Sequence, residues 1–176
     1  LLEREEWERI AAGLVQRHRA LNAFLRDVYG PGRDRSDGVV PQQVVQACPG
    51  FRPDVEHPVP AGGADGPPPV VVAGFDLLLG PDGWVVLEDN LRVPSGMAYA
   101  IANRRTTRAA LPLLRDGLHD VLDPEDAPAA LLRRLRAAAP PRCPRAEPVV
   151  VLLSDGPDNS AWFEHRTLAD AMGIPV

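Results

Sequence analysis

Apolar residues recur every three or four positions over residues 3–29, which is the period of an amphipathic helix. His18 lies on this apolar stripe, and no residue close to it in sequence would orient its ring, so a core or boundary histidine is favoured over a catalytic one. The sequence Gly30-Pro31-Gly32 is expected to end the helix. The stripe consists of Trp7, Ile10, Ala11, Leu14, His18, Leu21, Leu25 and Val28.

The segments that follow lose this helical period. The sequence DGVVPQQVVQACPGF at 37–51 predicts a short helix with Pro41 in its first turn. Residues 52–69 are rich in Pro and Gly and predict a loop. The run VVVAGFDLLL at 70–79 is apolar at almost every position, which predicts a strand buried on both faces.

Helical and strand patterns alternate in the second half of the chain. Residues 97–111 predict a helix with Ser95 as its N-cap, and residues 126–138 predict another helix. A Pro-rich linker at 140–148 leads into residues 149–176, where a strand, a loop, a helix and the first residues of a further strand make up most of a βαβ unit. We therefore predict an α/β fold.

The turn after the apolar run sets which strand residues face each other. The connection Pro81-Asp82-Gly83 suits a type I turn followed by a left-handed glycine, the three-residue hairpin with a bulge. This hairpin places Gly80 opposite Trp84, and counting back places Asp76 opposite Glu88.

Polar side chains then gather at the end of the hairpin. Asn90 points to the same face as Glu88, and opposed residues have Cβ atoms roughly 4.5–5.5 Å apart, so Asp76, Glu88 and Asn90 would converge. Two unpaired carboxylates repel each other unless a cation lies between them, and Mg²⁺ takes carboxylate and amide ligands together with phosphate oxygens. Asp89 points to the other face and is expected to face solvent. The alternative is a surface hairpin whose polar end simply extends into water.

The residues after Asn90 favour the binding site over that alternative. Arg92 is a bidentate ligand for an oxyanion, and Ser95-Gly96-Met97 opens a helix whose free N–H groups attract anions. A cation cluster beside an anion cradle is what a nucleoside triphosphate site requires.

Composition limits the other possibilities. The chain has 176 residues and a net charge of −5 without a long basic run, which argues against a nucleic-acid surface. All 19 Lys+Arg residues are Arg, so a phosphate contact made by lysine must fall to arginine or lie outside this chain. Cys48 and Cys143 lack metal-ligand spacing and indicate thiols of a reducing cytoplasm. No apolar run approaches the roughly 20 residues that cross a bilayer, and no signal-peptide pattern opens the chain, although both ends look cut.

With these residues in view, the sequence resembles the ATP-grasp superfamily, in which an Asp on one strand and a Glu-x-Asn on the next hold the magnesium ions on ATP. The string VLEDNLRVPSGMAYAIANR is more specifically similar to the circularly permuted ATP-grasp group, relatives of the amide-forming domain of glutathionylspermidine synthase. GPDNSAWFEHRTLA resembles a second motif of that group, and LNAFLRDVYG and DGVVP resemble its N-terminal region.

The resemblance implies an ATP-dependent carboxylate–amine ligase. ATP phosphorylates a small-molecule or peptide carboxylate, an amine attacks the acyl phosphate, and an amide forms. It implies that Asp76, Glu88 and Asn90 hold Mg²⁺ and that Arg92, with the Ser95-Gly96 backbone, steadies phosphate or acyl phosphate. Arg104, one helical stretch further on, is a second candidate for the phosphates, although a solvated helix face explains it equally well.

The sequence pattern and the resemblance together predict a domain organisation. A helical segment covers 1–51, a loop covers 52–69, and the metal- and phosphate-binding portion covers 70–139. The linker at 140–148 then joins the truncated start of a Rossmann-like subdomain at 149–176.

The second motif places polar residues at a helix N-terminus, namely Asn159, Ser160, Glu164 and His165. A site for a carboxylate or peptide substrate is one interpretation, and a helix cap with Glu164 in the first turn is the other. Members of the group continue well past residue 176, into segments that cover the adenine and supply a phosphate-binding lysine. A truncated non-catalytic module and an ATP-grasp phosphotransferase therefore remain alternatives to the ligase. The 176 residues alone are expected to lack ligase activity, to bind ATP weakly if at all, and to self-associate.

Overall fold

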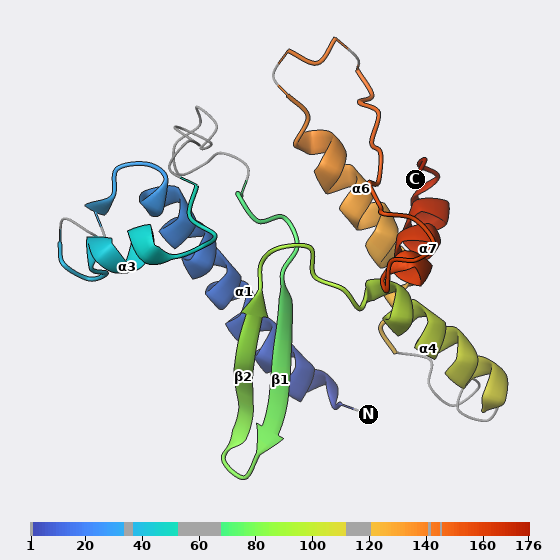
Figure 1. Ribbon diagram of the computed structural model, residues 1–176. Coiled ribbons are helices and arrows are strands. Elements are labelled where there is room, and N and C mark those ends of the chain that lie inside the picture. Colours follow the sequence, from blue (N-terminus) through green and yellow to red (C-terminus); the bar gives the residue numbers. More distant parts are fainter. Residues whose placement is uncertain (1, 34–36, 53–67, 112–120, 141, 145) are drawn as a thin grey trace. The chain divides into compact units, whose positions relative to one another are not determined.

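The computed structural model describes residues 2–33, 37–52, 68–111, 121–140, 142–144 and 146–176 (Figure 1). The chain forms two compact units, Leu1–Arg92 and Val93–Val176. The division falls inside the segment 70–139 that the resemblance implies is one portion. The physical reason is that the hairpin packs on the N-terminal helix whereas the following helix packs within the second unit.

The first unit combines a long helix, a short helix and a hairpin. Helix α1 covers Arg4–Val28, so the predicted helix is confirmed to within a residue at each end. Helix α3 covers Gln42–Ala47, and Pro41 is its N-cap rather than a residue of its first turn. The predicted loop at 52–69 lies largely outside the described residues. Strands β1 (Gly74–Gly80) and β2 (Gly83–Asn90) form a two-stranded antiparallel sheet.

Polar side chains of α1 hold the segment that leads into β1. Asn22, which is 3% exposed, accepts a hydrogen bond from the Val70 N–H at 2.8 Å and donates to the Val70 carbonyl at 3.3 Å. His18 Nε2 lies 3.0 Å from the same carbonyl. His18 is therefore a boundary residue that organises the backbone, as the sequence pattern favoured. Val70 is tied to α1 in this way, and residues 70–73 do not form strand, so β1 begins four residues later than predicted.

Burial of the hairpin on both faces is not observed. One face packs toward α1, while Leu78, Val85 and Leu87 on the strands are 53%, 53% and 63% exposed. The apolar run at 70–79 predicted burial on both faces, and among the described residues of the first unit α1 covers one face of the hairpin (Figure 1).

The second unit is helical. It contains α4 (Met97–Ala110), a 3₁₀ turn η2 (Pro124–Asp126), α6 (Ala127–Ala137) and α7 (Trp162–Met172). Helix α7 packs against both α4 and α6. It ends at Gly173, whose φ of 64° is the left-handed conformation that glycine adopts without steric cost.

The predicted βαβ unit is only partly formed. Residues 149–153 are not assigned as strand, and the Leu152 N–H donates to the Pro175 carbonyl at 3.0 Å, a single backbone link between the two ends of the unit. On α7, Phe163 is 47% exposed whereas Met172 is buried. The packing of α7 on its neighbouring helices accounts for this burial. Among the described residues, no helix has both the length and the apolar character needed to cross a membrane.

Candidate functional site

The predicted pairing of Asp76 with Glu88 is observed, but the register that produces it differs from the one expected. Next to the turn, Gly80 pairs with Gly83 rather than with Trp84, and the pairing keeps this offset as far as Leu77 and Val86. A β-bulge then interrupts the ladder, and Asp76 pairs with Glu88. Gly83 has a φ of 113°, a positive angle as the turn sequence predicted.

The bulge decides which side chains share a face. Between the turn and the bulge, Trp84 pairs with Leu79, and Val86 pairs with Leu77. The side that faces α1 is lined by Trp84, Val86 and Leu77. Leu87 is the extra residue on β2, so the alternation of faces shifts by one at that point. Glu88 therefore faces away from α1, together with Asp76. Without the bulge, Glu88 would continue the Trp84–Val86 face and point toward the helix.

The three predicted metal ligands lie together at the open end of the hairpin. Asp76 and Glu88 are cross-strand partners with exposed side chains, and Asn90 is two residues beyond Glu88. The Asn90 side-chain amide donates to Glu88 Oε1 at 2.9 Å, which leaves its amide oxygen available for another partner. Asp76 has no hydrogen-bond or ion-pair partner among the described residues. The cluster thus offers two carboxylates and an amide oxygen to solvent.

Three side chains are fewer than a metal site built from protein ligands alone would use. Among the described residues, no group of three or more His, Cys, Asp or Glu side chains is placed to hold a metal ion. Two carboxylates and an amide instead match a hard cation that keeps water or substrate oxygens in its remaining positions.

Asp89 lies on the face opposite Glu88, as predicted, but it does not simply face solvent. Its carboxylate accepts two hydrogen bonds from Arg17 of α1, each 2.6 Å long. The hydrogen bond from the Arg17 guanidinium lowers the pKa of the Asp89 carboxyl below its usual value. Arg17 was not singled out by the sequence, because nothing in the spacing of the two residues relates them.

The cradle expected at the N-terminus of α4 is occupied by a side chain of the protein itself. The Glu164 carboxylate, 4% exposed, accepts hydrogen bonds from the Gly96 N–H at 2.9 and 3.0 Å and from the Ala98 N–H at 3.0 Å. Gly96 is the N-cap, and Ser95 makes no capping hydrogen bond. Two of the N–H groups expected to be free for a phosphate are thus bound by Glu164, a buried carboxylate well placed at the positive end of the helix.

The arginines of α4 are directed to the segment before α6. Arg104 donates to the Leu122 carbonyl at 3.1 Å, Arg105 forms two 3.0 Å hydrogen bonds with Glu125, and Arg108 pairs with Asp123 at 2.7 Å. Arg105 lowers the pKa of Glu125 through its hydrogen bond. The Arg104 guanidinium is thus engaged by a backbone carbonyl within the second unit. Arg92, in contrast, is exposed and has no partner among the described residues.

The other residues of the second motif are largely engaged within the second unit. Asn159 accepts a hydrogen bond from the Ala161 N–H at 2.8 Å and donates to Asp155 at 3.1 Å. The first bond closes an Asx turn just before α7, whose N-cap is Ala161 and has no side-chain cap. His165 Nδ1 lies 2.7 Å from Ser154 Oγ, and Ser154 Oγ also accepts from the Gly156 N–H at 3.2 Å. Ser160 is exposed and makes no described hydrogen bond.

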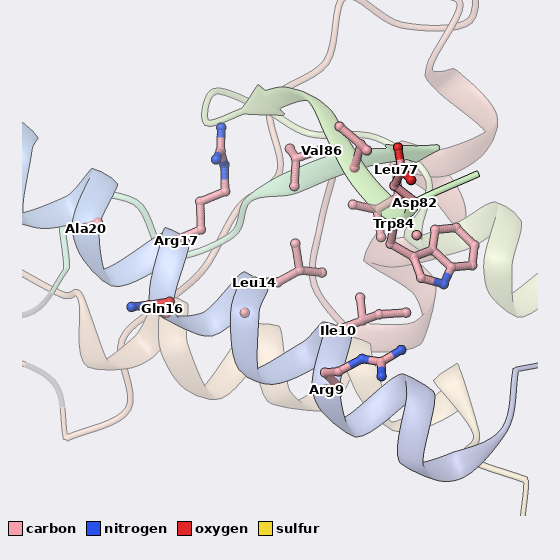
Figure 2. Close-up of a pocket in the computed structure, with 13 residues that line it drawn as sticks. Arg9, Ile10, Leu14, Gln16, Arg17, Ala20, Leu77, Asp82, Trp84 and Val86 are labelled. Carbon is pink, nitrogen blue, oxygen red and sulfur yellow. The ribbon is translucent and has the colours of Figure 1, made fainter. Parts of the chain in front are cut away.

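A groove of about 790 Å³ lies between α1 and the hairpin (Figure 2). Its residues are mainly apolar and include Ile10, Leu14, Leu77, Trp84 and Val86, with Arg17 at its edge. The three predicted metal ligands do not line it. The groove and the carboxylate cluster are therefore separate features on opposite faces of the hairpin.

A cross-strand pair of carboxylates at the end of an antiparallel hairpin is the pattern on which the resemblance to the ATP-grasp superfamily rests. The chain matches the family of circularly permuted ATP-grasp proteins, type 2, over residues 1–176. It belongs to this family.

Several longer proteins are similar to the chain over almost its whole length. A Frankia alni protein named "Putative glutamate--cysteine ligase 2-3" is 47% identical over 173 residues, which are 98% of this chain and 19% of the relative. A Frankia casuarinae protein named "Putative glutamate--cysteine ligase 2-2" is 43% identical, over 100% of this chain and 20% of the relative. An uncharacterized protein of Synechocystis is 41% identical, over 100% of this chain and 35% of the relative. The chain therefore spans between about a fifth and a third of the lengths of these relatives.

Proposed function

We propose that this chain supplies the metal-binding hairpin of an ATP-dependent carboxylate–amine ligase. The observation that carries the proposal is the cross-strand pair of exposed carboxylates, Asp76 and Glu88, with Asn90 hydrogen-bonded to Glu88. Membership in the ATP-grasp family and the ligase names of the two Frankia relatives support the same class of reaction.

The donor set fits Mg²⁺. Asp76 and Glu88 supply carboxylate oxygens, and Asn90 supplies an amide oxygen while its N–H orients Glu88. One or two carboxylates plus substrate phosphates are the usual ligands of this ion. When bound, Mg²⁺ would neutralise charge on the transferring phosphoryl group. Arg92, exposed and close in sequence, would donate hydrogen bonds to a phosphate or acyl phosphate.

The remaining predicted ligands divide by whether their polar atoms are engaged. Ser95 and Ser160 are exposed and stay in the proposal as contacts to phosphate and substrate. The polar atoms of five others already make hydrogen bonds inside the second unit, so the proposal assigns them no ligand: Gly96, Arg104, Asn159, Glu164 and His165.

In the proposed reaction, ATP transfers its γ-phosphoryl group to a carboxylate, an amine displaces phosphate from the acyl phosphate, and an amide, ADP and phosphate result. The substrates are a small-molecule or peptide carboxylate and an amine. The names of the Frankia relatives make glutamate and cysteine one pair to test, and the resemblance to glutathionylspermidine synthase makes a peptide acid and a polyamine another.

The test is ADP release by the intact gene product, supplied with Mg²⁺, ATP and each acid with and without each amine. A ligase releases ADP in an amine-dependent manner and yields the amide by mass spectrometry. ADP release and a phosphorylated acid without any amine requirement would identify a phosphotransferase instead. If no combination released ADP and Mg-ATP did not change the thermal unfolding of the protein, the ligase proposal would be wrong and a non-catalytic module favoured.

A further inference from the structure

The three polar residues at the end of β2 are divided between two faces of the hairpin. Glu88 and Asn90 face away from α1 toward Asp76, whereas Asp89 between them faces α1. There it meets Arg17, which extends from α1 toward the hairpin (Figure 2). Arg17 Nε binds Asp89 Oδ1 and Arg17 Nη2 binds Asp89 Oδ2, each at 2.6 Å. This is the paired geometry in which a guanidinium fixes the plane of a carboxylate.

The ion pair and the bulge are two parts of one arrangement. Two consecutive carboxylates, Glu88 and Asp89, compete for the single position that faces Arg17. If β2 continued without the bulge, Glu88 would point to α1 and Asp89 would point away. Glu88 would then leave the face of Asp76, and the ligand cluster would be lost. The register with the bulge is the one in which Arg17 is bound to the shorter side chain.

We propose that Arg17 is a positioning residue for the candidate metal site, because its paired hydrogen bonds to Asp89 select the bulged register that turns Glu88 and Asn90 toward Asp76. This inference rests on the proposed metal-binding role of that cluster. Arg17 itself faces the other side of the hairpin and does not contact the cation.

Electrostatics alone predicts a different outcome, which makes the inference testable. Arg17 carries a positive charge close to the carboxylate cluster, so its removal should strengthen cation binding if charge were its only effect. Replacement by lysine keeps the charge and should then change nothing. A positioning role predicts weaker binding in both cases, because glutamine removes the charged fork and lysine offers a point charge without its paired geometry. Overall stability should change little, since exposed ion pairs contribute little to folding.

The experiment is titration of Mn²⁺ alone, followed by the electron paramagnetic resonance of the free ion, into the intact gene product. Mn²⁺ is chosen because it prefers the same oxygen ligands as Mg²⁺. Arg17→Gln and Arg17→Lys are compared with wild type, and Arg19→Gln is the matched control. Arg19 is exposed on the same helix and has no ion pair within the described residues. Glu88→Ala is the negative control, because it removes one carboxylate of the candidate metal site.

We expect about a 10-fold weaker affinity for Mn²⁺ in both Arg17 variants, the size of effect usual for residues that orient metal ligands, and no change in Arg19→Gln. Circular dichroism checks that each variant is folded. If Arg17→Gln does not fold, Arg17→Lys still tests the proposal. Affinity in Arg17→Lys equal to wild type, or tighter binding in Arg17→Gln, would overturn the positioning role. If wild type and Glu88→Ala bound Mn²⁺ equally, the proposed metal site itself would be wrong.

Discussion

The sequence indicates both the hairpin end and the α4 N-terminus as places for a ligand. In the structure, the polar groups of the first are exposed and those of the second are bound by another part of the protein. At the hairpin, Asp76 and Glu88 expose their carboxylates, and the only described hydrogen bond to either comes from Asn90. At α4, the Glu164 carboxylate is buried and accepts hydrogen bonds from two backbone N–H groups.

The difference separates structural polar groups from candidate ligands. Buried polar groups are almost always satisfied within the protein, and Glu164 and the α4 N-terminus satisfy each other. Adjacent exposed carboxylates have no such internal reason to be placed together, and their repulsion is relieved by a cation. We therefore expect the hairpin cluster to govern activity and Glu164 to govern stability, and the following changes test this division.

The largest expected effect is that of Glu88→Ala on turnover. One of the two carboxylates is lost, so Mg²⁺-dependent ADP release by the intact gene product should fall by at least about 100-fold, the upper end of the losses seen when metal ligands are merely misoriented. Without metal, the urea unfolding midpoint should stay the same or rise, since a repulsion is removed. Asp82→Ala, an exposed carboxylate at the other end of the same hairpin, is the control and should keep wild-type turnover. Full activity in Glu88→Ala would remove the hairpin from the site.

Glu164→Ala should produce the reverse profile. It removes the acceptor of two backbone N–H groups at a buried helix end, which should lower the free energy of unfolding by about 2 kcal/mol. Glu164→Gln keeps one oxygen acceptor and should lose less. Urea denaturation of both variants measures the effect. A variant that unfolds like wild type but loses activity would place Glu164 among the ligands after all.

Within the second motif, Asn159 and Ser160 allow the same comparison between an engaged and an exposed polar side chain, with smaller expected effects. Asn159→Ala loses the hydrogen bond to the Ala161 N–H in the turn before α7, and about 1 kcal/mol of stability should be lost with it. Ser160→Ala should leave stability unchanged because the exposed hydroxyl has no described partner. If Ser160 contacts a substrate, its loss should instead raise the KM for that substrate. Equal destabilisation by the two changes would contradict a stabilising role for the Asn159 hydrogen bond.

The smallest expected effect is a change in how the stability of the protein depends on pH in the acid range. Because Arg17 lowers the pKa of Asp89 in the folded state, the ion pair stabilises the protein above the unfolded carboxyl pKa of about 4. This contribution is lost as pH falls from about 5 through the folded pKa. Asp89→Asn should therefore unfold less steeply with falling pH than wild type, with a small loss of stability near pH 7. Parallel pH profiles of thermal unfolding for the two proteins would show that the ion pair does not form in solution.

Much of the fold was predictable because it depends on neighbours in the chain. The helical period identified α1 almost to the residue, and the Pro-Asp-Gly turn identified the hairpin. The pairing of Asp76 with Glu88 was predicted correctly, but through a register that the structure does not have near the turn. The bulge at Leu87 restores the pairing, and no local signal distinguishes Leu87 from the apolar residues before it.

The sequence by itself determined where the helices and the hairpin lie, that carboxylates and an amide end the second strand of the hairpin, and that the chain resembles a family of ATP-dependent enzymes. Only the tertiary structure decided which polar groups are already engaged. Arg17 meets Asp89 across 72 positions of the chain, and Glu164 meets Gly96 across 68. Such partners depend on which surfaces pack together, and the local periodicity of the sequence does not predict that packing. For this reason the sequence proposed a cation cluster and an adjacent anion cradle, and packing left the first exposed and placed Glu164 in the second.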